Sequence, residues 1–67
     1  MLIKLTKDSF PPAPMWVNAD HIVRVEPTRG RFVEGMCSVL TIATDRDKWV
    51  VRESPEEIAK IWHQNNT

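Results

Sequence analysis

The chain has few residues that could carry out covalent or acid–base chemistry. His21 and His63 are its two histidines, and Cys37 is its one cysteine. A hydrolytic triad needs a nucleophile, a base and an orienting acid, and the sequence has neither a nucleophile elbow nor a glycine-rich oxyanion loop. His63, in the last turn of a predicted helix, suits the negative end of the helix dipole. Cys37 has no adjacent base that would stabilise a thiolate. We therefore expect a protein that is not an enzyme.

Metal ions and phosphate cofactors are not expected either. Asp20 and His21 are adjacent, so a strand would point their side chains to opposite sides. Asp45 and Asp47 share a turn, but no calcium-loop pattern surrounds them. The two glycines of the chain match no phosphate-binding or dinucleotide fingerprint. The sequence thus predicts no metal site and no cofactor.

Tryptophan is abundant, with three residues in a chain of 67. Tryptophan is enriched at the energetic centres of interfaces, although a small core also needs large rings. The helical spacing of Trp62 predicts a place in the core. Trp16 and Trp49 fall on predicted strands and are the candidate interface residues, and we expect one of them to face a partner subunit.

Several arginines could form a nucleic-acid-binding stripe if the strand order aligned them. These candidate contacts are Arg24, Arg29, Arg31 and Arg52. Acidic residues beside them would cancel much of their field, and the formal net charge is +0. The composition therefore favours a mixed, solvated surface over a nucleic-acid partner.

Length and cysteine content set the scale of the fold. A chain of 67 residues forms one domain, residues 1–67, near the lower limit for an independent core. A single cysteine allows no internal disulfide, so self-association is the expected reinforcement, and we predict a homo-oligomer. No apolar run is long enough to span a bilayer, and the first residues lack the features of a signal peptide. We expect a cytoplasmic protein without membrane insertion.

Alternating hydrophobic residues predict a sheet over residues 1–53. In the first strand, Ile3 and Leu5 are expected on the face opposite Leu2 and Lys4. The predicted strands cover residues 1–7, 15–17, 21–26, 36–44 and 48–53. In the third strand, Ile22, Arg24 and Glu26 should oppose Val23 and Val25, and Pro27 should end it. A tight polar turn at residues 45–47 should join the last two strands as an antiparallel hairpin. The proline-rich segment 11–14 is either a stiff turn or a short recognition segment.

The segment Ser54-Pro55-Glu56-Glu57 predicts the start of a helix. Ser54 and Glu57 form a capping box, and Pro55 suits the first helical position. Ile58, Ile61 and Trp62 follow as one apolar stripe. We expect a helix over residues 54–64 and a frayed polar tail over 65–67. The predicted fold is α+β, mainly β: a small antiparallel meander of four to five strands with one C-terminal helix.

Three segments carry a family resemblance. Met1-Leu2-Ile3-Lys4-Leu5-Thr6, Val17-Asn18-Ala19-Asp20-His21-Ile22 and the segment from Val50 to Ile58, which contains Glu53-Ser54-Pro55-Glu56-Glu57, resemble the small FlbD-like flagellar and swarming-motility proteins of bacteria. The proline insert at 11–14 and a longer loop at 27–35 depart from that family's pattern. The resemblance implies a role in motility or assembly, and it implies no catalytic residues.

A weaker likeness concerns the carbon-storage-regulator RNA-binding proteins, which also begin Met-Leu-Ile and have a β-rich body. Only Arg52 is a rough counterpart of their basic contact positions. We therefore expect a self-associating, non-enzymatic interaction or accessory protein with a link to motility. The alternative is a nucleic-acid-binding regulator acting on RNA.

Overall fold

The computed structural model describes residues 1–65. In chain order, the elements are β1 (Leu2–Lys7), β2 (Ala13–Asn18), the 3-10 helix η1 (Ala19–His21), β3 (Ile22–Arg29), β4 (Met36–Ile42), β5 (Lys48–Val51) and α1 (Pro55–Asn65). Five antiparallel strands and one C-terminal helix confirm the α+β, mainly β, fold class. Of the tail expected to fray, Asn65 ends α1, and residues 66 and 67 lie outside the described part of the chain.

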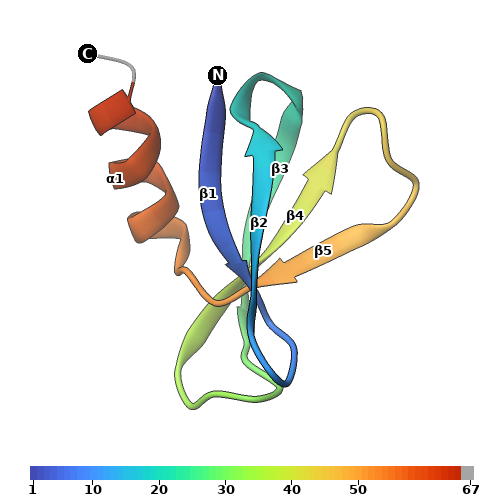
Figure 1. The fold of residues 1–67 in the computed structure, drawn as a ribbon, viewed down its shortest axis with the longest axis vertical. Helices are drawn as coiled ribbons and strands as arrows, with labels where there is room; N and C mark the ends of the chain where they lie inside the picture. Colours follow the sequence, from blue (N-terminus) through green and yellow to red (C-terminus); the bar gives the residue numbers. More distant parts are fainter. Residues whose placement is uncertain (66–67) are drawn as a thin grey trace.

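The strands form one sheet in the order β2-β1-β5-β4-β3. β3, β4 and β5 make a meander, and the β1–β2 hairpin joins it along β5 (Figure 1). The junction is short, because β1 and β5 share the single paired position Lys7 and Val51. Two backbone hydrogen bonds extend it: Asp8 N–H donates to the Val50 carbonyl at 2.9 Å, and Arg52 N–H donates to the Thr6 carbonyl at 2.8 Å. This order leaves β2 and β3 at the two edges of the sheet.

The predicted alternation is confirmed in β1 and β4. In β1, Ile3 and Leu5 are buried while Leu2 and Lys4 are exposed. In β4, Leu40 and Ile42 are buried, whereas the residue directly before each of them is only partly buried. Side chains from four strands and the helix therefore meet in one apolar core. Its buried members are Ile3, Leu5, Val17, Leu40, Ile42, Val51 and Ile58. The predicted hairpin of β4 and β5 is also confirmed.

The alternation predicted for the third strand is wrong. Ile22 pairs with Ile42, but the next paired position is Arg24 with Thr41, so Val23 forms a β-bulge. The extra residue shifts the following side chains by one position, and a shift of one residue moves each of them to the opposite face of the sheet. Ile22 and Val25 consequently pack on the core, whereas Val23 is 66% exposed.

Pro27 does not end the third strand, as the sequence suggested. β3 continues to Arg29, with Pro27 paired to Ser38. A proline lacks the N–H that an inner strand needs, but an edge strand can accommodate it. Pro14 is tolerated in β2 for the same reason, so only the first part of the proline-rich segment forms the turn.

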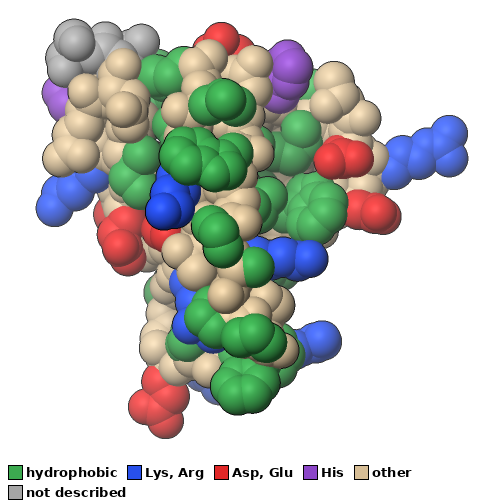
Figure 2. Space-filling view, in the orientation of Figure 1, with side chains coloured by type: hydrophobic (Ala, Val, Ile, Leu, Met, Phe, Trp, Pro, Cys, Tyr) green, Lys and Arg blue, Asp and Glu red, His purple; other side chains and the backbone are tan. Residues whose placement is uncertain are grey.

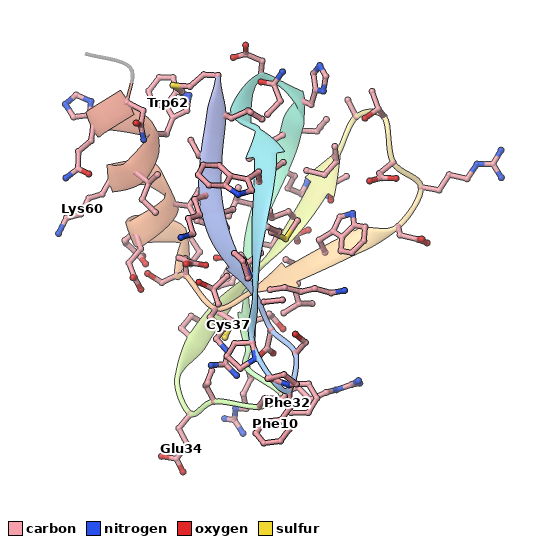
Figure 3. All side chains as sticks on the ribbon, viewed as in Figure 1. Phe10, Phe32, Glu34, Cys37, Lys60 and Trp62 are labelled. Atoms are coloured by element: carbon pink, nitrogen blue, oxygen red, sulfur yellow. The ribbon has the colours of Figure 1, made fainter. Side chains whose placement is uncertain are left out.

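The start of α1 follows the predicted capping box. The Glu57 N–H donates to Ser54 Oγ, and the Ser54 N–H donates to Glu57 Oε1, both at 3.2 Å. Ile58 is buried against the sheet, and α1 lies beside β1 in Figure 1. Trp62 departs from the expectation of a core residue, because it is 43% exposed. It lies on the side of α1 that faces β1, whereas Lys60 points away from the sheet (Figure 3).

Candidate functional site

The outer face of the β1–β2 hairpin carries the most exposed tryptophan. Trp16 is 63% exposed and pairs with Lys4 across the two strands, with Lys4 Nζ 5.9 Å from the centroid of the Trp16 ring. Leu2, on the same face of β1, is also 63% exposed. Figure 2 shows hydrophobic side chains gathered over this hairpin. A large apolar side chain held on a rigid strand at the edge of a sheet is suited to protein contact.

Trp49, the other candidate interface residue, lies in a different environment. It packs against the core, and its Nε1 donates a hydrogen bond to Asp45 Oδ2 at 3.1 Å. Lys7 Nζ lies 5.2 Å from the centroid of its ring. These contacts use the ring within the chain, so the structure leaves Trp16 as the exposed member of the pair.

The four candidate arginines do not form one stripe. Arg24 lies on β3 with its guanidinium 3.9 Å from Glu26 Oε1. Arg29 is five positions further along the same strand, roughly 16 Å away. Arg52 is engaged inside the fold: its Nε lies 3.6 Å from Asp8 Oδ1, and its Nη2 donates to the Ser9 carbonyl at 3.2 Å. Arg29 and Arg31 are exposed next to that pair.

Two loops meet at the end of the molecule where Arg29 and Arg31 lie. The Asp8 side chain is 1% exposed, and its Oδ2 accepts the Arg31 N–H at 2.9 Å, which ties residues 8–12 to residues 30–35. At the tip, the Phe10 and Phe32 ring centroids are 6.5 Å apart, and Phe10 is 83% exposed. Figure 3 shows the two rings next to each other, with Glu34 pointing away from them.

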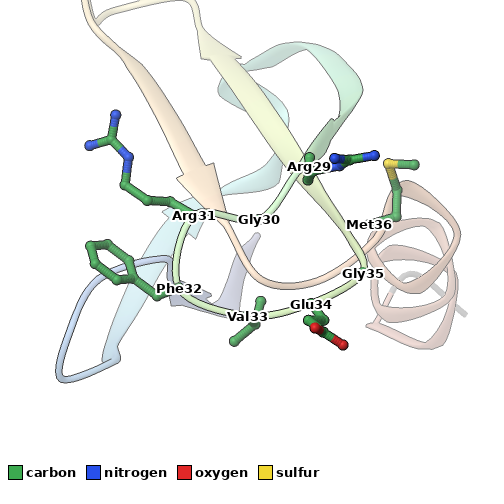
Figure 4. A pocket seen from close by; sticks show the side chains of 8 residues that line it. All are labelled: Arg29, Gly30, Arg31, Phe32, Val33, Glu34, Gly35 and Met36. Carbon is green, nitrogen blue, oxygen red and sulfur yellow. The ribbon is translucent and has the colours of Figure 1, made fainter.

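The loop between β3 and β4 encloses a hollow of about 740 Å³ (Figure 4). Its lining residues are Arg29, Gly30, Arg31, Phe32, Val33, Glu34, Gly35 and Met36. Gly35 has φ +113°, a left-handed conformation that glycine adopts without strain. The sequence analysis named Arg29 and Arg31, which line this hollow, as candidate contacts, but it did not predict the pairing of Phe10 with Phe32.

A second hollow of about 300 Å³ lies between α1 and the sheet. It is lined mainly by apolar side chains, with Ile3 and Ile22 from the sheet side and Ile58 and Trp62 from α1. Trp62 lines this hollow, and its ring is partly exposed because no other side chain of residues 1–65 fills the space beside it.

Cys37, next to the loop between β3 and β4, is fully buried, as a core residue would be. Burial raises the pKa of the Cys37 thiol, and the nearby Asp8 carboxylate raises it further. A protonated, enclosed thiol is a poor nucleophile. Within residues 1–65, no group of three or more His, Cys, Asp or Glu side chains could hold a metal ion. Over the same residues, no helix is long and apolar enough to cross a membrane.

Comparison with protein-family models, with curated proteins and with solved structures finds no match for this chain. The surfaces described above therefore carry the inference of function.

Proposed function

We propose that this chain is a non-enzymatic interaction protein of the cytoplasm that acts as a homo-oligomer. The observation that carries the proposal is the apolar outer face of the β1–β2 hairpin, where Trp16 and Leu2 are each 63% exposed. Burial of exposed apolar area is the main driving force for association. A formal net charge of +0 adds no long-range repulsion between copies. The small core makes additional burial between chains favourable for stability as well.

Sedimentation velocity across a concentration series tests this proposal. The mass should rise from 7.8 kDa toward twice that value as the concentration increases. Trp16→Ser should weaken the dimer by about 2 kcal/mol, roughly 30-fold in Kd, because truncating a central aromatic residue removes much of the binding energy. Phe10→Ser is the matched control, since Phe10 is also aromatic and exposed but lies at the loop end. A mass of 7.8 kDa at every concentration would contradict the proposal.

A link to flagellar or swarming motility is the biological process that we propose for the oligomer. Its support is the resemblance of three segments to FlbD-like proteins. Those segments supply β1, the passage from β2 through η1, and the passage from β5 into α1. A deletion strain should lose swimming or swarming, and expression of the chain should restore it. Unchanged motility in the deletion strain would contradict this part of the proposal.

A second candidate function is RNA binding at the loop end. The specific observation in its favour is the Phe10–Phe32 pair beside Arg29 and Arg31. Bases of a single strand stack on exposed aromatic rings, each worth about 1–3 kcal/mol, while arginines contact the phosphates. Arg52 and Arg24 are excluded from this version of the site, because acidic partners engage them.

Titration with single-stranded RNA at low salt tests the second candidate. Phe10→Ala should reduce affinity, and binding should weaken steeply as salt rises. The matched control is Val23→Ala, which removes an exposed apolar side chain from β3 instead. Absence of binding at low salt would contradict RNA as a partner.

A further inference from the structure

The open edge of β2 has backbone N–H and carbonyl groups that are complementary to the same edge in a second copy of the chain. β1 and β2 pair in register from Leu2 with Asn18 to Lys7 with Ala13, and the Ala19 N–H donates to the Met1 carbonyl at 2.8 Å. Hydrogen-bonding positions alternate along antiparallel strands. Ala13, Met15 and Val17 therefore direct their backbone groups toward β1, and the alternate residues direct theirs away from the sheet.

The outward groups of β2 are few. Pro14 has no N–H, so it offers only a carbonyl. Trp16 offers both an N–H and a carbonyl. Asn18 offers an N–H, and as the N-cap of η1 its carbonyl faces the first turn of that helix. The open edge thus presents two donors, the N–H groups of Trp16 and Asn18, and two acceptors, the carbonyls of Pro14 and Trp16. In an antiparallel pair these groups are complementary about Trp16.

We propose that β2 pairs antiparallel with β2 of a second copy, about a two-fold axis at Trp16, so that the two five-stranded sheets become continuous. This inference deepens the proposed self-association and rests on it. In this register each Trp16 N–H donates to the Trp16 carbonyl of the other copy. Each Asn18 N–H donates to the Pro14 carbonyl of the other copy. All free edge donors are then satisfied, and the missing N–H of Pro14 faces the Asn18 carbonyl that η1 already uses.

Side chains on both faces of the seam favour the same register. On the outer face, the two Trp16 rings are directly opposite, and Lys4 of each copy flanks its own ring. On the inner face, Met15 lies opposite Val17 of the other copy, and both already pack on their own cores. Aromatic and apolar cross-strand pairs stabilise such a seam. A closed two-fold contact also stops at the dimer, because each chain has only one such edge.

The β3 edge is unsuited to the same role. The bulge at Val23 interrupts its regular pairing, and Pro27 removes a donor within it. Arg24 and Glu26 place charges along it. Bulges, prolines and charges are the features that protect an edge strand from pairing. The open edge of β2 is therefore the one that a second copy can extend.

Hydrogen exchange of the wild-type chain, followed by NMR at low and high concentration, tests the pairing. The Trp16 and Asn18 amides should exchange freely in the monomer and slow about tenfold where nine-tenths of the chains are paired. The Val23 amide, which lies in the bulge, is the internal control and should exchange at the same rate in both samples. Sedimentation of the same samples reports whether a dimer is present.

The outcomes separate this inference from the self-association on which it rests. A doubled mass with slowed Trp16 and Asn18 amides supports the β2 seam. If the mass doubles while both amides still exchange freely, the seam is wrong and the copies associate through another surface. If the mass stays at 7.8 kDa and both amides exchange freely, self-association and the seam both fail.

Discussion

The two edges of the sheet are built in opposite ways. Along β2, the whole span from Ala13 to Asn18 pairs with β1 without irregularity, and an exposed tryptophan lies at its centre. Each edge strand contains one proline, Pro14 in β2 and Pro27 in β3, but β3 also has the bulge at Val23 and the charged side chains of Arg24 and Glu26. Regular, apolar edges invite further strands, whereas irregular and charged edges resist them. The difference indicates that only one side of this sheet is available for extension.

Removing the irregularities of β3 should have the largest effect. A double variant that lacks Val23 and carries Pro27→Val would pair regularly along β3 and offer every N–H of that edge, as well as the open edge of β2. Because each copy could then pair on both sides, association would no longer close at a dimer, and long assemblies should form. Light scattering should show masses far above that of the wild type.

The controls for this experiment are the two single changes. Each leaves either the bulge or the proline in β3, beside the charges of Arg24 and Glu26 that all the variants keep, so each should stay close to the wild-type mass. A double variant with the wild-type mass would mean that the bulge and the proline do not limit pairing, and the contrast between the edges would be lost.

A smaller effect is expected when the fold is weakened away from both edges. Ser54→Ala removes the hydroxyl that accepts the Glu57 N–H, and loss of such a cap costs about 0.5–2 kcal/mol. Denaturant unfolding should show the reduced free energy, measured at a concentration where the chain is monomeric. Ser54→Thr is the matched control, because threonine can also cap. The dimer Kd of the folded Ser54→Ala chain should match the wild type, and a large change would connect α1 to the interface.

The smallest expected effect is that of alkaline pH on the free energy of unfolding, through Cys37 at the β3 side of the sheet. Cys37 pairs with Thr28 of β3, and burial followed by the Asp8 charge raises the pKa of its thiol above 9.0. A group with a raised pKa in the folded state contributes stability that is fully present below its ordinary pKa and lost as pH rises through the folded value. The free energy of unfolding should therefore fall above about pH 9.

Cys37→Ser supplies the control for the alkaline effect, because serine does not titrate in this range. The additional loss of stability in the wild type, relative to this variant, isolates the thiol. If both chains respond identically to alkaline pH, Cys37 is accessible to water and the β3 side of the sheet is less closed than its geometry indicates.

The sequence predicted the parts of the fold that depend on neighbouring residues. The alternation around Ile3 and Leu40 and the capping box at Ser54 are local patterns, and each has a local physical cause. The bulge at Val23 was not predictable in this way, because the register of β3 depends on its pairing with β4. The prediction that Pro27 ends the strand was wrong for a related reason: a proline is tolerated inside a strand that lies at the edge of the sheet, and that position is set by the fold as a whole.

The candidate surfaces were predicted only in part. Trp16 and Trp49 look equivalent in the sequence, and strand order alone separates an edge residue from one packed on the core. The apposition of Phe10 and Phe32 could not be foreseen, because the buried Asp8 carboxylate that joins their loops acts between residues far apart in the chain. Such contacts exist only once the sheet has formed.

Disulfide trapping across the seam tests the central claim most directly. In the proposed register, position 16 faces itself in a hydrogen-bonded pair with Cα atoms about 5.5 Å apart, within the range that a disulfide can bridge. Trp16→Cys should therefore form a covalent dimer under mild oxidation, while Val23→Cys, equally exposed but on the other edge, should not. The buried Cys37 is common to both variants. Equal trapping at the two positions, or trapping at Val23→Cys alone, would contradict the account.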